Sequence, residues 1–287
     1  MQTKSFLGLN PQGFHRVVYD EWGDPAAKNV LVCVHGLTRN AFDFKWLAEA
    51  MPHDWRVVAP DIVGRARSDW LRDAARYTYP QYMADLNALM ARLDTPNVFW
   101  MGTSMGGLLG MMLASLPQTP IKGLALNDIG PFVPAAGLKR LMKYVPKTHF
   151  FKEFTEVLHF LKSNLQGYDG LSAMQWQEVA RQSVFWDEVT QTWQMRYDPQ
   201  VASTLKPDDI KDQDFWRHWE ALRCPVLALH GANSDILNGD TAQQMALRHQ
   251  TKVVTFADQG HALSLGTTAQ IDLIKNWLID QAKTNPS

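Results

Sequence analysis

The segment at residues 97–114 constrains the fold of this chain more than any other. It reads Asn-Val-Phe-Trp-Met-Gly-Thr-Ser-Met-Gly-Gly-Leu-Leu-Gly-Met-Met-Leu-Ala. The short apolar run predicts a buried strand, Gly102-x-Ser104-x-Gly106 predicts a tight turn, and the small and apolar residues that follow predict a helix. A serine on such a turn has its hydroxyl pushed clear of the backbone, so Ser104 is the candidate nucleophile.

The same turn supplies part of an oxyanion-binding site. A helix that begins after Ser104 points its first N–H groups and the positive end of its dipole toward the serine. We therefore expect the backbone N–H of Met105 to be one oxyanion donor. The second is expected in the loop after the apolar strand at 29–34, from Leu37, with Thr38 as the alternative.

Strand and helix patterns alternate along most of the chain. The expected strands are 14–19, 29–34, 56–61, 98–101, 121–128, 224–231 and 252–257, and the expected helices are 41–51, 81–93, 241–249 and 268–283. This alternation calls for right-handed crossovers. It predicts an α/β fold with a mostly parallel central sheet and helices on both faces.

The alternation stops between residues 131 and 219, where no convincing core strand is found. That stretch holds 15 of the 31 aromatic residues. A structureless loop of this length is rare in a compact domain. We therefore expect an inserted helical cap at 131–219, between two parts of one core at 1–130 and 220–287.

Three loops at one edge of the predicted sheet carry the groups that a serine nucleophile needs. Functional residues of open α/β sheets lie outside the carboxyl ends of the strands. Ser104, Asp235 and His261 follow strands in the order expected for nucleophile, acid and base. Asp128 also ends a strand and is the alternative acid. The prediction is that Asp235→Asn removes activity, whereas Asp128→Asn leaves most of it.

Other polar and sulfur-bearing residues receive structural interpretations. His35 and His230 end strands and are expected to hold their loops by hydrogen bonds. Cys33 and Cys224 lie in apolar strands without metal-ligand spacing, so they are expected to be core residues, and no metal or organic cofactor is predicted. Arg39 could meet a substrate carboxylate, although an ordinary surface arginine is the preferred interpretation.

Composition excludes several classes of function. The chain has 287 residues and a net charge of −1, which gives no electrostatic case for nucleic acid or an anionic membrane. The amino-terminal residues contain no apolar signal segment, and no apolar run is long enough to span a bilayer. We expect a cytoplasmic protein whose partner is a small-molecule substrate.

These motifs together resemble those of α/β-hydrolases with a serine nucleophile and a cap, over nearly the full length. The matching pieces are His35-Gly36, Asp61-x-x-Gly64 with Ser68-Asp69, residues 102–107, the Asp235 loop and Gly260-His261. The resemblance implies an esterase, lactonase, thioesterase, perhydrolase or ring-cleavage hydrolase. Ser104 at the turn argues against epoxide hydrolases and dehalogenases, which use an aspartate there. Arg65 and Arg67 flank Ala66 where the family usually has glycine, and the sequence does not explain them.

The preferred function is therefore hydrolysis of a small to medium, largely apolar carboxylic ester through an acyl-enzyme on Ser104. Apolar pockets are built from aromatic and aliphatic side chains, and the predicted cap is rich in them. Two alternatives remain: carbon–carbon hydrolysis of ring-cleavage diketones, and a ligand-binding receptor on a hydrolase scaffold.

Overall fold

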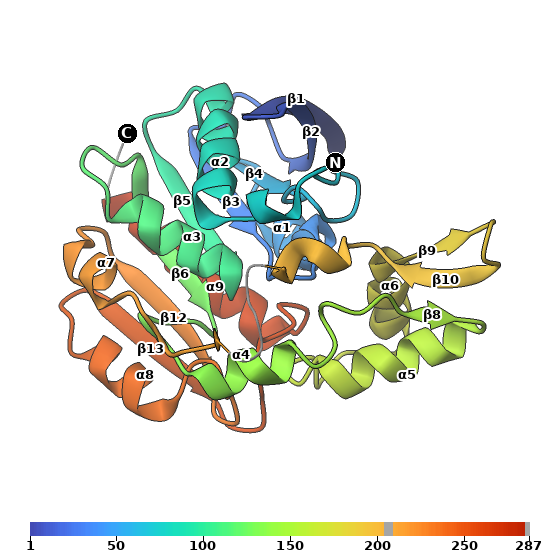
Figure 1. The fold of residues 1–287 in the computed structure, drawn as a ribbon. Helices are drawn as coiled ribbons and strands as arrows, with labels where there is room; N and C mark the ends of the chain where they lie inside the picture. The colour runs from blue at the N-terminus through green and yellow to red at the C-terminus, as the bar shows by residue number, and fades with distance from the viewer. Residues whose placement is uncertain (204–208, 285–287) are drawn as a thin grey trace.

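The computed structural model describes residues 1–203 and 209–284, which form one eight-stranded sheet with helices on both faces (Figure 1). The strand order is β1-β2-β4-β3-β5-β6-β12-β13. The strands are β1 (Gln2–Asn10), β2 (Gly13–Trp22), β3 (Asn29–Val34), β4 (Trp55–Pro60), β5 (Val98–Thr103), β6 (Ile121–Asn127), β12 (Val226–Gly231) and β13 (Thr251–Phe256). The pairs β1–β2 and β2–β4 are antiparallel and the others are parallel, so the predicted fold class is confirmed.

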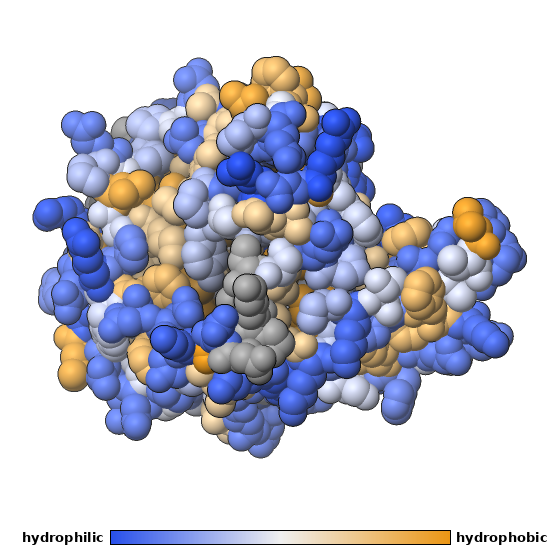
Figure 2. Space-filling view, viewed as in Figure 1, coloured by the Kyte–Doolittle hydropathy of each residue, from blue (hydrophilic) through white to orange (hydrophobic). Residues whose placement is uncertain are grey.

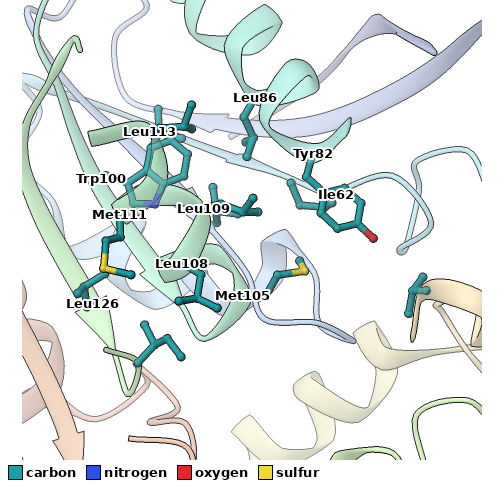
Figure 3. Close-up of a cluster of buried hydrophobic side chains, with 14 of the residues drawn as sticks. Ile62, Tyr82, Leu86, Trp100, Met105, Leu108, Leu109, Met111, Leu113 and Leu126 are labelled. Atoms are coloured by element: carbon teal, nitrogen blue, oxygen red, sulfur yellow. The ribbon is translucent and has the colours of Figure 1, made fainter. Parts of the chain in front are cut away.

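Two apolar clusters fill the space between the sheet and its helices. One contains side chains of α2 (Tyr79–Leu93), α3 (Met105–Ala114) and α8 (Gly239–Ala246). The other contains side chains of α1 (Lys45–Ala50) and α9 (Thr268–Thr284). Figure 3 shows part of the first cluster, where Trp100 of β5 lies among leucines of α2 and α3. Strands covered on both faces read as continuous apolar runs, which is why the central strands were predictable.

The amino-terminal end departs from the prediction. β1 was not expected, because Leu7 and Leu9 are exposed and hide the alternation that marks a half-buried strand. The expected helix at 41–51 is divided into a 3₁₀ turn, Ala41–Phe44, and α1. The side chain of Asn40 accepts a hydrogen bond from the N–H of Phe42 and caps the 3₁₀ turn.

The segment between β6 and β12 is mixed rather than purely helical, which corrects the prediction. Its helices are α4 (Ala135–Leu141), α5 (Phe154–Asn164), α6 (Ala173–Ser183), the 3₁₀ turn Pro199–Ala202 and α7 (Trp216–Ala221). Its strands are β7 (Phe132–Val133), β8 (Phe150–Phe151), β9 (Val184–Asp187), β10 (Thr192–Met195) and β11 (Gln213–Asp214). In the described residues these strands pair only with one another. The expected boundary at 219 falls inside α7, which packs against α3.

Part of this segment projects from the body as an arm formed by α5, β8, β9 and β10 (Figure 1). The ring of Trp193 packs edge-on against the rings of Trp186 and Phe154, with centroid distances of 5.4 Å and 5.5 Å. These contacts hold the arm together. Figure 2 shows a largely hydrophilic face with apolar patches on this arm. Across residues 1–203 and 209–284, none of the helices has the length and apolar character that a membrane crossing requires.

Candidate active site

Ser104 occupies a strained turn between β5 and α3. Its φ is 50° and its ψ is −115°, a conformation that costs free energy for a residue with a side chain. The turn is possible because Gly106 has no Cβ: a Cβ at this position would lie 2.0 Å from the carbonyl oxygen of Val34. Glycine is therefore required by the close approach of α3 to the end of β3.

A hydrogen-bond chain connects three loops at the carboxyl edge of the sheet. The hydroxyl of Ser104 lies 2.9 Å from Nε2 of His261. On the other side of the ring, Nδ1 lies 2.7 Å from the carboxylate of Asp128. Ser104 and His261 thus come together as predicted from the motifs, and the acid beside the histidine is Asp128, which directly follows β6.

The prediction that Asp235 holds the histidine is wrong. Its carboxylate binds the guanidinium of Arg140 from α4, with Nη2 2.8 Å from Oδ1 and Nε on Oδ2. Burial would raise the pKa of Asp235, but the hydrogen bonds and charge of Arg140 hold that pKa below its ordinary value. Arg140 could not be recognised as this partner from the sequence, because the partner of a loop aspartate depends on where the inserted segment lies.

The loop after β12 still contributes to the acid. The backbone N–H of Gly231 donates to Oδ1 of Asp128 at 2.7 Å, and the hydroxyl of Ser234 donates to Oδ2. Asp128 is fully buried, and these donors with His261 satisfy its carboxylate. A buried carboxylate in such a setting is held in one orientation.

His35 holds the loop that follows β3, as predicted. Its Nδ1 lies 2.7 Å from the carbonyl of Gly36, and its Nε2 accepts from the N–H of Ile62 at 2.9 Å. Burial lowers the pKa of His35 to about 3, so the ring is neutral. His230 instead contacts a neighbouring strand, with Nδ1 3.2 Å from the hydroxyl of Thr255.

Leu37 and Met105, the predicted oxyanion donors, both line a cavity with Ser104. Within the described part of the chain, neither backbone N–H donates a hydrogen bond to another residue. Both amides therefore have free hydrogen-bonding capacity beside the serine. The oxyanion role of these two residues stays a prediction.

Arg65 is a residue that sequence reasoning could not explain. It is fully buried, and its Nε donates to the carbonyl of Leu37 at 2.8 Å. Nη1 donates to the hydroxyl of Tyr82 at 2.9 Å, and Nη2 lies 3.7 Å from Sδ of Met105. A single guanidinium thus contacts both predicted oxyanion residues. Arg67 has a different part, since it binds the carboxylates of Asp20 and Asp61.

Two cavities meet at Ser104. The larger, of about 280 Å³, is bounded by apolar and aromatic side chains of α2, α3 and the inserted segment, with Tyr79, Leu108 and Leu138 among them. The smaller, of about 60 Å³, is also bounded mainly by apolar side chains, but its lining includes Arg39, Arg140 and His261. His261 borders only the smaller cavity. Among the described residues, the two cavities therefore differ in charged side chains, which line the smaller cavity and not the larger one.

Arg39 is not a surface residue, which corrects the preferred interpretation. It is buried, its Nε lies 2.9 Å from the carboxylate of Asp43, and its Nη1 donates to the hydroxyl of Ser183 at 2.7 Å. Cys33 and Cys224 are buried free thiols, as predicted. No group of three or more potential metal-ligating side chains occurs in residues 1–203 and 209–284.

Comparisons with known proteins agree on one family. The model of the alpha/beta hydrolase family matches residues 31–270. A 3-hydroxybutyrate-oligomer hydrolase from Cupriavidus necator is 41% identical over 273 residues, which cover 92% of each chain. A solved structure from Rickettsia typhi superposes with a TM-score of 0.90 at 32% identity, over 98% of this chain and 99% of that one. An alpha/beta hydrolase from Novosphingobium aromaticivorans gives a TM-score of 0.86 at 32% identity, over 97% and 98%.

Proposed function

The chain belongs to the alpha/beta hydrolase family, and from this premise we propose that it hydrolyses carboxylic esters with Ser104 as nucleophile. The observation that carries the proposal is the hydrogen-bond chain from Ser104 through His261 to Asp128. A serine hydroxyl is a weak nucleophile unless a neutral imidazole takes its proton. A carboxylate on Nδ1 sets the tautomer and stabilises the imidazolium that forms.

In the acylation half-reaction, Oγ of Ser104 attacks the ester carbonyl carbon while its proton passes to Nε2 of His261. The carbonyl oxygen becomes an oxyanion, which the N–H groups of Leu37 and Met105 bind. The carbon–oxygen bond to the leaving group then breaks, and His261 gives its proton to the leaving oxygen. The products are a free alcohol and an acyl-enzyme.

In the deacylation half-reaction, water takes the place of the alcohol. His261 accepts a proton from the water as its oxygen attacks the acyl carbon, and a second oxyanion forms. The bond to Ser104 breaks, the proton returns to Oγ, and the carboxylic acid leaves. The overall reaction consumes one water per ester, and each residue returns to its starting state.

The proposed substrate class is an ester of a short hydroxy acid. The relative from Cupriavidus necator is named for hydrolysis of 3-hydroxybutyrate oligomers, and it matches this chain over 92% of its length. The apolar cavity suits the methyl-bearing chain of such an oligomer. Val133, Leu138 and Val201 line this cavity, which supports a cap role for the segment 131–219.

The test is turnover of p-nitrophenyl butyrate and of the linear trimer of 3-hydroxybutyrate by wild type and by Ser104→Ala. Loss of a nucleophilic serine lowers kcat by about 10⁴- to 10⁶-fold. We expect a loss of this size on both substrates, with an unchanged melting temperature. Turnover that survives the substitution would contradict the proposed nucleophile. Turnover of p-nitrophenyl butyrate without cleavage of the trimer would contradict the substrate class.

A further inference from the structure

The smaller cavity beside Ser104 contains two arginines with different engagement. Arg39 uses Nε and Nη2 on Asp43 and Nη1 on Ser183, so each of its three nitrogens has a partner, and the side chain is buried. Arg140 places Nε and Nη2 on Asp235 and also hydrogen-bonds to the side chain of Tyr144, and its side chain is 23% exposed. These contacts do not use all five N–H groups of a guanidinium. Arg140 is therefore the arginine that retains donors for a ligand.

The position of His261 decides which part of an ester enters this cavity. His261 must protonate the leaving oxygen, so the leaving group has to lie next to Nε2. His261 lines the smaller cavity and not the larger one. The leaving alcohol therefore occupies the smaller cavity with Arg140, and the acyl chain extends into the larger cavity.

We propose that Arg140 binds a free carboxylate on the leaving alcohol, so that the enzyme removes hydroxy-acid units one at a time from the carboxylate end of an ester chain. This inference rests on the proposed function and names the end of the substrate that the same site recognises. In an ester of a 3-hydroxy acid the carboxylate carbon is three bonds from the ester oxygen. Both His261 and Arg140 line the same small cavity, of about 60 Å³, so a short leaving group there can meet both side chains.

The surroundings of Arg140 favour this binding mode. Tyr144 borders the same cavity, and burial raises the pKa of its hydroxyl against the effect of Arg140, so the phenol stays protonated and can donate. Among the described residues that line the larger cavity none is charged, so a carboxylate placed there would lose its hydration without compensation. The carboxylate of the substrate is thus accepted on one side of Ser104 only.

Asp235 competes with the substrate for the same guanidinium. It is partly exposed and occupies two of the donors of Arg140. Removing the charge of Asp235 leaves the positive charge of Arg140 uncompensated, so Arg140 attracts an incoming anion more strongly. Substitutions of Asp235 and Arg140 should therefore act in opposite directions on the KM of carboxylate substrates.

The experiment compares three linear trimers of 3-hydroxybutyrate: the free acid, its methyl ester, and the free acid acetylated on its hydroxyl end. Products are identified by mass spectrometry, and kcat/KM is measured for each substrate. A hydrogen bond to a charged group corresponds to a change of about ten- to hundredfold in kcat/KM. We expect wild type to prefer the free acid over the methyl ester by this factor, to accept the acetylated trimer, and to release monomer as the first product.

The variants are Arg140→Gln, Arg140→Lys and Asp235→Asn, with the exposed Arg181→Gln of α6 as a matched control. The preference for the free acid should fall close to one in Arg140→Gln, persist in part in Arg140→Lys, and stay at the wild-type value in Arg181→Gln. Asp235→Asn should lower KM for the free acid and not for the methyl ester. Because the preference is a ratio within one variant, partial loss of folded protein does not change it.

Several results would overturn the inference. Equal kcat/KM values of wild type on the free acid and the methyl ester would do so. An equal loss of kcat/KM on both substrates in Arg140→Gln would also do so, because it would show that Arg140 only forms an ion pair that joins the inserted segment to the core. If turnover of p-nitrophenyl butyrate depends on Ser104 while the free-acid preference is absent, this inference fails and the proposed function stands. If that turnover does not depend on Ser104, the proposed function itself fails.

Discussion

The loops after β6 and β12 start side by side, because these two strands are hydrogen-bonded neighbours, and yet their aspartates do different things. Asp128 is completely buried and bonds to His261. The side chain of Asp235 is 34% exposed and bonds to Arg140 of the inserted segment. Two carboxylates at one edge of the sheet thus have different partners. Asp128 bonds to a residue of the core, and Asp235 bonds to a residue of the inserted segment.

This difference shows that the partner of a carboxylate, rather than its place in chain order, defines its role. The last residue of β12, Gly231, supports the acid with its N–H, and Ser234 of the following loop supports it with its hydroxyl. Asp128 is thereby held by donors from the neighbouring strand and its loop, while Asp235 of that loop bonds to Arg140. The expected chain order of nucleophile, acid and base is kept, but the acid follows β6 rather than β12.

The largest effect that tests this comparison is expected from Asp128→Asn. The amide cannot stabilise the imidazolium and favours the wrong tautomer of His261, so kcat should fall by about 10⁴-fold. The measurement is kcat on p-nitrophenyl butyrate, with circular dichroism to confirm the fold. A nearly normal kcat in this variant, together with an inactive Asp235→Asn, would reverse the two assignments.

The second effect concerns Arg65, which contacts the two predicted oxyanion residues. Arg65→Gln shortens the side chain and removes a buried charge near the oxyanion, so kcat should fall by about 10- to 100-fold with little change in KM. The neighbouring Arg67→Gln is the control, since the side chain of Arg67 binds Asp20, Asp61 and Thr3. Arg67→Gln should lower the melting temperature more than kcat. A lower kcat in both variants to the same degree would show that Arg65 only supports folding.

A smaller effect is expected from Ser234→Ala, which removes one donor to Asp128 and leaves the N–H of Gly231 in place. The loss of one hydrogen bond to a charged group should lower kcat by about tenfold. The measurement is kcat on p-nitrophenyl butyrate, with circular dichroism to confirm the fold. An unchanged kcat would argue against a part for this contact in catalysis.

The smallest effect should be that of Asp235→Asn on an uncharged ester. An ion pair of this exposure is worth little, so kcat on p-nitrophenyl butyrate should change by no more than about fivefold. A decrease of several hundredfold would place Asp235 in the catalytic chain. The matched comparison is Asp128→Asn in the same assay.

The fold and two members of the site were predictable from the sequence because their signals are local. The continuous apolar runs identify the central strands, and the glycines around Ser104 identify the turn, since only glycine allows the approach of Val34 to Gly106. Gly260-His261 lies in the loop that begins where the last strand, β13, ends. Each of these features depends on residues that are close in sequence.

The choice of acid and the roles of the arginines could not be predicted, because they depend on contacts between distant segments. His261 and Asp128 are 133 residues apart, and Arg140 and Asp235 are 95 apart. Arg65 reads as an unusual residue in a loop until its contact with Leu37 is seen. The short strands β7, β8 and β11 were also missed, because each has only two residues and its pairing comes from far along the chain.

The most direct test of the central claim is proton NMR of the Nδ1–H of His261 in wild type, Asp128→Asn and Asp235→Asn. A ring proton in a short hydrogen bond to a carboxylate is strongly deshielded, so it gives a resonance far downfield of the amide region. The account predicts this resonance in wild type and in Asp235→Asn, and its loss or large upfield shift in Asp128→Asn. The opposite pattern, with the signal lost only in Asp235→Asn, would contradict the pairing of His261 with Asp128.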